Sequence, residues 1–243
     1  MRAFYENSLA LIHNAGFGAL ARGAGRMVLE HLRARPGEAG TVVDLGCGSG
    51  ILAEQISTAG FSVVAVDVSP HLLSLARARA PRAEFLLSSI YDVELPRAAA
   101  VTMIGEVSNY VLDGRPEEAD LRRLIGRIGE ALEPGGLLLF DAAAPGRGAE
   151  TAQQSFTHRP EWSVTVEARE DAGTGRLTRE ITTFRRVGDL YRREDETHVL
   201  RLWPPDLVEG VLAEAGFKTE RFERYDDVLL PKGLIGYRCV KAG

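Results

Sequence analysis

The sequence lacks features that would each point to a particular class of protein, among them a basic excess and paired cysteines. Its 243 residues carry 29 Lys and Arg against 34 Asp and Glu, which gives a formal net charge of −5. A general nucleic-acid binder usually presents a basic surface, so we expect no nucleic-acid partner. The two cysteines, Cys47 and Cys239, lie far apart, as expected of reduced thiols in a cytosolic protein.

Long apolar runs and metal-binding spacings are missing as well. No run reaches the ~20 apolar residues of a membrane-spanning helix, and the N-terminal segment lacks the cleavage site of a signal peptide. We therefore expect a cytoplasmic protein with no membrane partner. The five histidines, at positions 13, 31, 71, 158 and 198, show no ligand spacing, so we expect no metal.

What is present is organised around residues 42–50, VVDLGCGSG. An apolar run rich in β-branched residues contains Asp44 and is followed by glycine at every second position, at Gly46, Gly48 and Gly50. An apolar helical pattern comes next. Glycine is needed where the backbone takes a positive φ or approaches a ligand closely. A following helix directs its unpaired N–H groups at the same point. The pattern predicts a strand, a ligand-binding turn and a helix.

The strand-like runs alternate with helical patterns along the chain. They cover residues 41–44, 62–67, 83–87, 99–104 and 137–141, with two more at 217–222 and 233–240. This alternation predicts an α/β fold with a doubly wound, mostly parallel seven-stranded sheet. We expect the last strand to be antiparallel and to lie at the edge of the sheet.

Three parts of the chain are predicted. Residues 1–150 combine a helical N-terminal cap with most of the core, 151–203 form an insertion, and 204–243 return to the core. Within the insertion, 151–160 are expected to be a polar connector and 161–203 a three-stranded antiparallel meander. The helical residues 3–33 are either a helix pair packed on the sheet edge or a cap that faces a ligand.

The glycine turn has the spacing G-x-G-x-G, not the G-x-G-x-x-G of dinucleotide enzymes. VVDLGCGSG resembles the first motif of the class I S-adenosylmethionine-dependent methyltransferases, and the inserted meander at 161–203 resembles in position that of the members that act on small molecules. VAVDVSP, at 64–70, resembles the second motif. The loop at 88–92, GEVSNY at 105–110 and LEPGGLLLFD at 132–141 resemble weaker later motifs. The resemblance implies a Rossmann-like core with S-adenosylmethionine as cofactor.

The cofactor's chemistry suits residues that follow the strands, because ligands of doubly wound sheets bind beyond the carboxyl ends of the strands. Asp44 and the turn amides suit the ammonium and carboxylate of the methionine tail. Asp67, about 20 residues further on, is placed to accept hydrogen bonds from the ribose hydroxyls. The residues expected to contact the cofactor are Tyr5, Phe17, Asp44, Gly46, Cys47, Gly48, Gly50, Asp67, Val68, Ser89, Ile90, Gly105 and Glu106.

These assignments have plainer alternatives. The alternative to ribose binding by Asp67 is that it caps the following helix. Glu106 is expected on the sulfonium side with Gly105, and its alternative is a solvated acid in a loop. Ser89 and Ile90 are expected to flank the adenine. Many relatives have Gly-Asp where this chain has Ser88-Ser89, which leaves Asp92 as the only nearby acid for the adenine amino group.

The acceptor is expected to be a small molecule with an O or N nucleophile, since the signature of DNA amino-methylating enzymes is absent. Methyl transfer from a sulfonium is an in-line displacement, so the enzyme chiefly aligns and desolvates the nucleophile. His13 is the first candidate base and His198 the second, while Tyr110 and Tyr5 are expected to position the substrate. The meander is expected to cover the pocket, to form a homodimer or to be purely structural.

Several alternatives stay open at this point. Arg185, Arg186, Arg192 and Arg193 either receive an anionic substrate or form solvated strand faces. The enzyme could instead break another sulfonium bond and release methylthioadenosine. A non-catalytic protein that binds S-adenosylmethionine is a third reading, and a nicotinamide dehydrogenase is a remote fourth because of the turn spacing.

Overall fold

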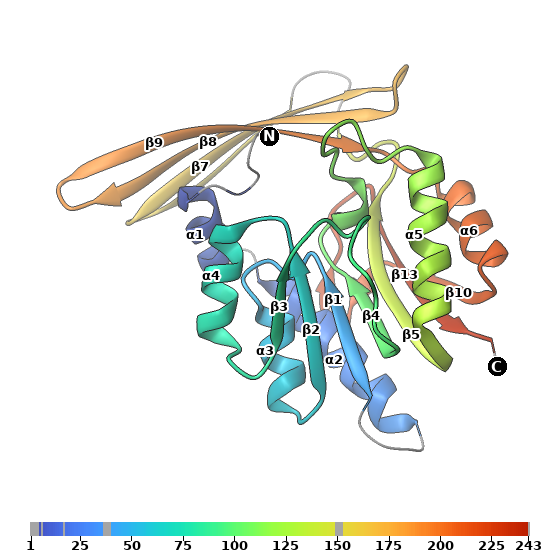
Figure 1. Cartoon of the computed structure of the whole chain (residues 1–243). Coiled ribbons are helices and arrows are strands. Elements are labelled where there is room, and N and C mark those ends of the chain that lie inside the picture. Colours follow the sequence, from blue (N-terminus) through green and yellow to red (C-terminus); the bar gives the residue numbers. More distant parts are fainter. Residues whose placement is uncertain (1–4, 6, 17, 36–39, 149–152, 243) are drawn as a thin grey trace.

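The computed structural model describes residue 5 and residues 7–16, 18–35, 40–148 and 153–242 (Figure 1). Its core is a seven-stranded sheet in the order β3-β2-β1-β4-β5-β13-β10. The strands are β1 (Thr41–Leu45), β2 (Ser62–Asp67), β3 (Glu84–Leu87), β4 (Ala98–Met103), β5 (Leu132–Ala143), β10 (Phe217–Phe222) and β13 (Leu234–Lys241). The predicted doubly wound, mostly parallel sheet is confirmed.

One expectation about this sheet is wrong. Strand β13 is antiparallel to its neighbours, as predicted, but it lies between β5 and β10 and is not at the edge. Its side chains explain the position, because Tyr237 and Cys239 are buried in the core. The edge strand is β10, where Lys218 and Glu220 alternate with less polar residues, a composition typical of an exposed edge.

Helices cover both faces of the sheet (Figure 1). One apolar cluster joins α2 (Ala19–Ala34), α3 (Ile51–Thr58) and α4 (Pro70–Arg79) to one face. Another joins α5 (Glu118–Ala131) and α6 (Pro205–Glu214) to the other face. Ser69 caps α4 by accepting a hydrogen bond from the Leu72 N–H at 3.2 Å, and Pro70 occupies the first helical position. No helix of the described residues is long and apolar enough to span a membrane.

The inserted meander has four strands, so the prediction of three strands after a polar connector is wrong. Its strands are β6 (Gln153–Arg159), β7 (Trp162–Asp171), β8 (Arg176–Val187) and β9 (Leu190–Arg201), paired in that order. Strand β6 lies at the edge and pairs only with β7. Ser155 and Thr157 face one side and the exposed Phe156 faces the other, so the strand has no apolar alternation that the sequence could reveal.

The meander lies across the end of the core at which the parallel strands finish, and it extends past the core on one side (Figure 1). Helix α1 (Asn7–Gly16) packs under it, where Leu9 and Ile12 contact Trp162, Val164 and Ile181. Helix α2, in contrast, packs on the core. The two N-terminal helices therefore do not form a pair on the sheet edge, and α1 lies between the meander and the glycine turn.

Candidate active site

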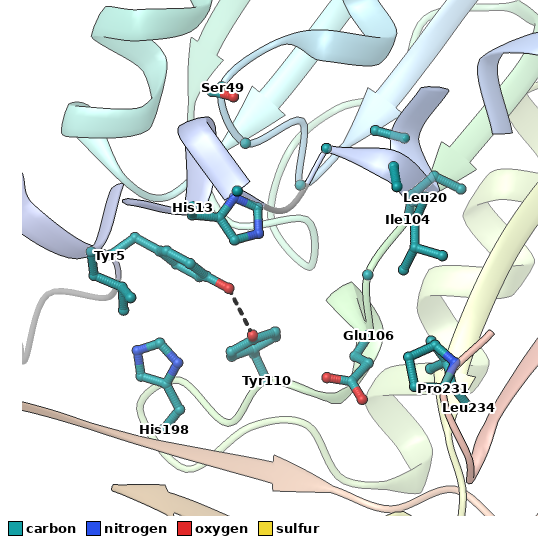
Figure 2. A pocket seen from close by; sticks show the side chains of 18 of the residues that line it. Tyr5, His13, Leu20, Ser49, Ile104, Glu106, Tyr110, His198, Pro231 and Leu234 are labelled. Atoms are coloured by element: carbon teal, nitrogen blue, oxygen red, sulfur yellow. Dashed lines mark hydrogen bonds between the residues drawn. The ribbon is translucent and has the colours of Figure 1, made fainter. Parts of the chain in front are cut away.

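Two connected cavities lie beyond the carboxyl ends of β1, β2 and β4. The larger, of about 720 Å³, extends from the glycine turn to the inner face of the meander. The smaller, of about 120 Å³, lies against β2 and the loop after β3. Figure 2 shows several of the side chains at this site. The residues common to both cavities are Tyr5, His13, Gly46, Gly48, Ile104, Gly105 and Tyr110.

The glycine turn is held against β2 and opens into both cavities. The Gly46 and Cys47 N–H groups donate to the Val66 carbonyl at 2.7 and 2.9 Å. Gly48 has a φ of +54°, and a Cβ there would meet nothing within 4 Å. Because Gly48 has no side chain, a ligand can approach the backbone closely at this position.

Gly50, also expected to contact the cofactor, lines neither cavity. It has a φ of +77°, and a Cβ would come within 2.9 Å of the Ala76 Cβ. The reason for glycine at this position is the close approach of α4 to the start of α3.

Asp44 is a buried carboxylate on the wall of the larger cavity. Its Oδ1 accepts a hydrogen bond from the Thr102 hydroxyl at 2.8 Å. Its Oδ2 is buried and has no hydrogen-bond partner among the described residues. Burial raises the pKa of Asp44 to about 7 against the lowering effect of Thr102, and the nearby Asp67 charge adds to the rise. A cationic group placed beside Oδ2 would satisfy this oxygen and stabilise its charge.

Asp67 ends β2 in the wall of the smaller cavity. Its Oδ2 accepts from the Gly48 N–H and its Oδ1 from the Ser69 N–H, both at 2.8 Å. Burial raises the pKa of this carboxyl, and the backbone N–H groups oppose the rise. Each carboxylate oxygen keeps acceptor capacity for a hydroxyl. Val68, Ser89 and Ile90 line the same cavity, as expected.

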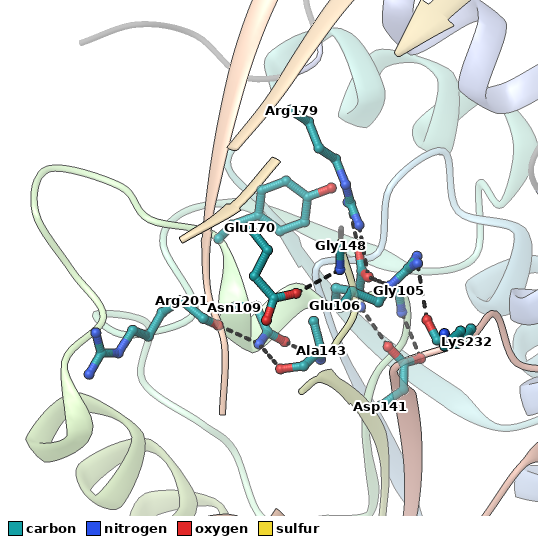
Figure 3. A network of polar contacts seen from close by, with 12 residues as sticks. Gly105, Glu106, Asn109, Asp141, Ala143, Gly148, Glu170, Arg179, Arg201 and Lys232 are labelled. Atoms are coloured by element: carbon teal, nitrogen blue, oxygen red, sulfur yellow. Dashed lines mark hydrogen bonds and ion pairs between the residues drawn. The ribbon is translucent and has the colours of Figure 1, made fainter. Parts of the chain in front are cut away.

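Glu106 is buried, so the alternative of a solvated loop acid is wrong. It follows Gly105 in the loop after β4 and has a φ of +63°. The Gly105 and Glu106 N–H groups donate to the Asp141 carboxylate at 2.9 and 2.6 Å, which holds this conformation (Figure 3). The Glu106 carboxylate accepts from Arg179 at 2.6 and 3.0 Å and from Arg147 at 2.5 Å. Burial acts to raise the pKa of Glu106, but the guanidinium groups outweigh it and lower the pKa.

An aromatic cluster stands where the two cavities meet. The Tyr5 and Tyr110 hydroxyls hydrogen-bond at 3.0 Å (Figure 2), and burial raises the pKa of both phenols. The His13 ring packs edge-on against Tyr5 with the centroids 5.0 Å apart. Burial, together with His198, lowers the pKa of His13 to about 4. His13 is therefore neutral near pH 7.

His198 lies on the meander opposite these residues. Its ring centroid is 5.3 Å from that of Tyr5 and 5.6 Å from that of Tyr110. Its Nε2 lies 2.9 Å from the Glu196 carboxylate, which also accepts from the Tyr5 N–H at 2.9 Å. The Glu196 carboxylate holds the imidazole in this orientation at the wall of the larger cavity.

Two other groups of candidates lie elsewhere. Asp92 forms an exposed ion pair with Arg115 at 2.8 Å and lines neither cavity, so it makes no contact at the expected adenine site. The four arginines around the β8–β9 turn also lie outside both cavities, with Arg186 paired to Glu161 and Arg193 to Asp195. Phe17 lies outside the described residues.

The comparisons with known proteins agree with this geometry. A family model described as a methyltransferase domain matches residues 42–136. "Putative methyltransferase GWCH70_2453" of Geobacillus sp. (strain WCH70) is 32% identical over 188 residues, which cover 72% of this chain and 73% of the relative. The chain belongs to the class I S-adenosylmethionine-dependent methyltransferases.

Solved structures share the fold of this methyltransferase over nearly its whole length. An S-adenosylmethionine-dependent methyltransferase from Clostridium acetobutylicum ATCC 824 has a TM-score of 0.81 at 20% identity, covering 98% of this chain and 99% of that one. The sugar N-methyltransferase KedS8 from Streptoalloteichus sp. ATCC 53650 has a TM-score of 0.75 at 20% identity, covering 100% and 96%.

The residues of this methyltransferase fit its cofactor. The buried Oδ2 of Asp44, which has no hydrogen-bond partner among the described residues, suits an ammonium group such as that of the methionine tail. Asp67 stands at the smaller cavity, where hydroxyls of a nucleoside would meet it. The open space at Gly48 leaves room between these two acids.

Four further residues support the site and were not predicted from the sequence: Arg179, Arg147, Thr102 and Glu196. Arg179 had a detectable signal, because it lies between Leu177 and Ile181 in an alternating strand and therefore faces inward with them. Thr102 is a polar residue inside an otherwise apolar buried strand. Arg147 lies in a glycine-rich loop without periodicity and Glu196 stands among other charged residues, so neither gave a comparable signal.

Proposed function

We propose that this methyltransferase transfers a methyl group to an oxygen or nitrogen nucleophile of a small molecule. The observation that carries the proposal is the meeting of the two cavities at Tyr5, His13, Gly105 and Tyr110. The smaller cavity suits the adenosine half of the cofactor. The larger one extends beyond the methionine site to the meander, and its volume of about 720 Å³ is within the range of small-molecule sites.

In this proposal S-adenosylmethionine supplies an electrophilic methyl group at the junction of the cavities. Asp44 holds the methionine ammonium, and Asp67 holds the ribose, with Ser89 and Ile90 against the adenine. The meander and α1 exclude water from the junction, which favours an in-line displacement by a desolvated nucleophile.

The aromatic cluster positions the acceptor and accepts its proton. Tyr5 and Tyr110 stay protonated near neutral pH, so their hydroxyls can donate to an acceptor oxygen or nitrogen. We assign the base to His198, because it lines the larger cavity and Glu196 fixes the orientation of its imidazole. His13, the first candidate from the sequence, is a weak base at a pKa of about 4, and its proposed role is to pack against Tyr5 and shape the junction.

The substrate class to test first is an amine- or hydroxyl-bearing small molecule. The purified protein is incubated with S-adenosylmethionine and a panel of such acceptors, and the products are measured by mass spectrometry. We expect S-adenosylhomocysteine together with an acceptor one CH₂ heavier. The His198→Gln variant should bind the cofactor normally and lose most of its turnover, with Arg193→Gln on the outer face of the meander as the matched control.

Two outcomes would overturn the proposal. Release of methylthioadenosine would show that another sulfonium bond is broken. A tight complex that consumes no cofactor across the whole panel would indicate a non-catalytic binding protein.

A further inference from the structure

A pair of partly buried arginines lies on the wall of the larger cavity. Arg179 extends from β8 to the Glu106 carboxylate (Figure 3), and its side chain is 15% exposed. Arg147, 20% exposed, reaches the same carboxylate from the segment after β5. Both residues line the cavity. The two guanidinium groups therefore border the space assigned to the acceptor.

The guanidinium groups outnumber the carboxylates that they contact directly. Two guanidinium groups share the single carboxylate of Glu106, and among the described residues no other carboxylate lies within 4 Å of either group. Arg179 uses two of its five N–H donors on Glu106. A buried charge is costly unless it is paired, so one positive charge at the cavity wall is available to an anion.

The rest of the cavity wall limits what that anion can belong to. The inner face of the meander is mainly apolar at Val164, Val166 and Ile181. Arg179 and His198 are directly opposite each other across β8 and β9, and such pairs lie on one face of a sheet with their Cβ atoms about 5 Å apart. An anion at Arg179 is therefore close to the proposed base and the junction of the cavities.

We propose that the methyl acceptor carries an anionic group that binds Arg179 and Arg147, with an apolar body against the meander. Arg179 is then the residue that determines specificity for acids over their neutral analogues. This inference rests on the proposed function, because it concerns the acceptor of the same site. A carboxylate and a phosphate share the required chemistry, and the probes below distinguish them.

The test uses protein saturated with S-adenosylhomocysteine, so that the sulfonium charge plays no part. Binding of 3-phenylpropionate, 2-phenylethyl phosphate and the neutral 3-phenylpropionamide is measured by calorimetry. We expect at least one anion to bind about tenfold or more tighter than the amide, as charge-assisted pairing predicts. Whichever anion binds more tightly identifies the group.

Three variants test the assignment to Arg179. Arg179→Gln should reduce the preference for the anion to about twofold or less, whereas the Arg193→Gln control should keep it. Glu106→Gln should strengthen anion binding, since it removes the carboxylate that competes for both guanidinium groups. This opposite change cannot result from a general loss of structure.

The inference is overturned if the wild-type protein binds the amide as tightly as both anions. It is also overturned if Arg179→Gln folds and keeps the preference, or if Glu106→Gln weakens anion binding. These results differ from a failure of the proposed function, because binding of S-adenosylhomocysteine is measured first and independently.

Discussion

At the scale of single residues, the site depends on carboxyl groups with pKa values above their ordinary range. Asp44, Asp67 and Asp141 are all buried, and burial raises the pKa of each. Asp141 is satisfied by two backbone N–H groups and by the Tyr225 hydroxyl at 2.9 Å, with a pKa of about 6. Asp44 differs from it in having one oxygen without a hydrogen-bond partner among the described residues. Asp141 supports the loop after β4, whereas this oxygen of Asp44 can still accept from a ligand.

Replacing Asp67 with alanine should weaken binding of S-adenosylmethionine at least tenfold. The ribose hydroxyls would lose charge-assisted hydrogen bonds worth ~1.5–3 kcal/mol, and the Gly48 N–H would lose its acceptor. Calorimetry measures the affinity of each protein for S-adenosylmethionine. The control is Asp92→Ala, because Asp92 is exposed and lines neither cavity. Equal affinities of Asp67→Ala and wild type would contradict the placement of the cofactor.

Affinity for S-adenosylmethionine should rise with pH up to about 7. The pKa of Asp44 in the free protein is about 7, so below this pH the carboxyl is mostly protonated and cannot pair with the ammonium. Well below the pKa, the affinity should rise by about tenfold for each pH unit. Titrations between pH 5 and 7.5 measure it, and Asp44→Asn should bind more weakly with a flatter profile. A wild-type profile that is flat over this range would contradict the pairing.

At the scale of elements, the strands and helices of the core followed from periodicity and capping. Residues 62–67 and 217–222 are strands with the predicted bounds. Ser69 and Pro70 begin α4 as capping chemistry requires. These signals are local, so one sequence suffices to detect them.

Other elements depended on contacts that a single sequence does not show. Strand β6 has no apolar face because its inner residues line a cavity and its outer Phe156 is exposed. The residues that complete the site, such as Arg179 and Glu196, come from strands more than a hundred residues beyond the glycine turn. The approach of Arg179 to Glu106 and of Glu196 to Tyr5 is a product of tertiary folding, whereas Asp44 and Asp67 were identified from their spacing alone.

The loop after β4 should be sensitive at Asn109. This fully buried side chain donates to the Ala143 and Arg201 carbonyls at 2.9 and 2.6 Å and accepts from the Ala143 N–H at 3.0 Å (Figure 3). Asn109→Ala would leave these groups unsatisfied and lower the free energy of unfolding by roughly 2–4 kcal/mol. Urea denaturation measures the loss against Gln154→Ala, an exposed control on β6. A loss as small as that of the control would contradict the role of Asn109 in holding this loop.

At the scale of the whole molecule, the meander is joined to the core at several points. The Trp203 indole donates to the Ser108 carbonyl at 3.1 Å, and the Val111 N–H donates to the Val199 carbonyl at 2.8 Å. The Glu194 and Glu196 carboxylates accept from the Ser8 and Tyr5 N–H groups at 3.0 and 2.9 Å. Negative charge at the start of α1 is favourable, so the meander, the cap and the loop that bears Tyr110 are connected.

The homodimer expected from the sequence stays a prediction, and the outer face of the meander is where it would form. Phe156, Phe184 and Tyr191 are 67%, 37% and 56% exposed, and the strand register places them on the face opposite the cavity. Analytical ultracentrifugation should find a dimer that Phe156→Asp converts to a monomer. The variant should keep its affinity for S-adenosylmethionine, because the substituted residue faces away from the cofactor. A wild-type monomer at high protein concentration would refute the dimer.

Tyr5 is bound at three points, and this has a kinetic consequence. Its N–H donates to Glu196, its carbonyl accepts from the Ser69 hydroxyl at 3.0 Å, and its own hydroxyl bonds Tyr110. Tyr5 lines both cavities, so we expect these three bonds to slow the departure of a nucleoside bound in the smaller one. We expect compulsory-ordered kinetics, in which S-adenosylmethionine enters first and S-adenosylhomocysteine leaves last. Product-inhibition patterns measure this order, and Tyr5→Ala should make substrate addition random and hasten the final step of the cycle.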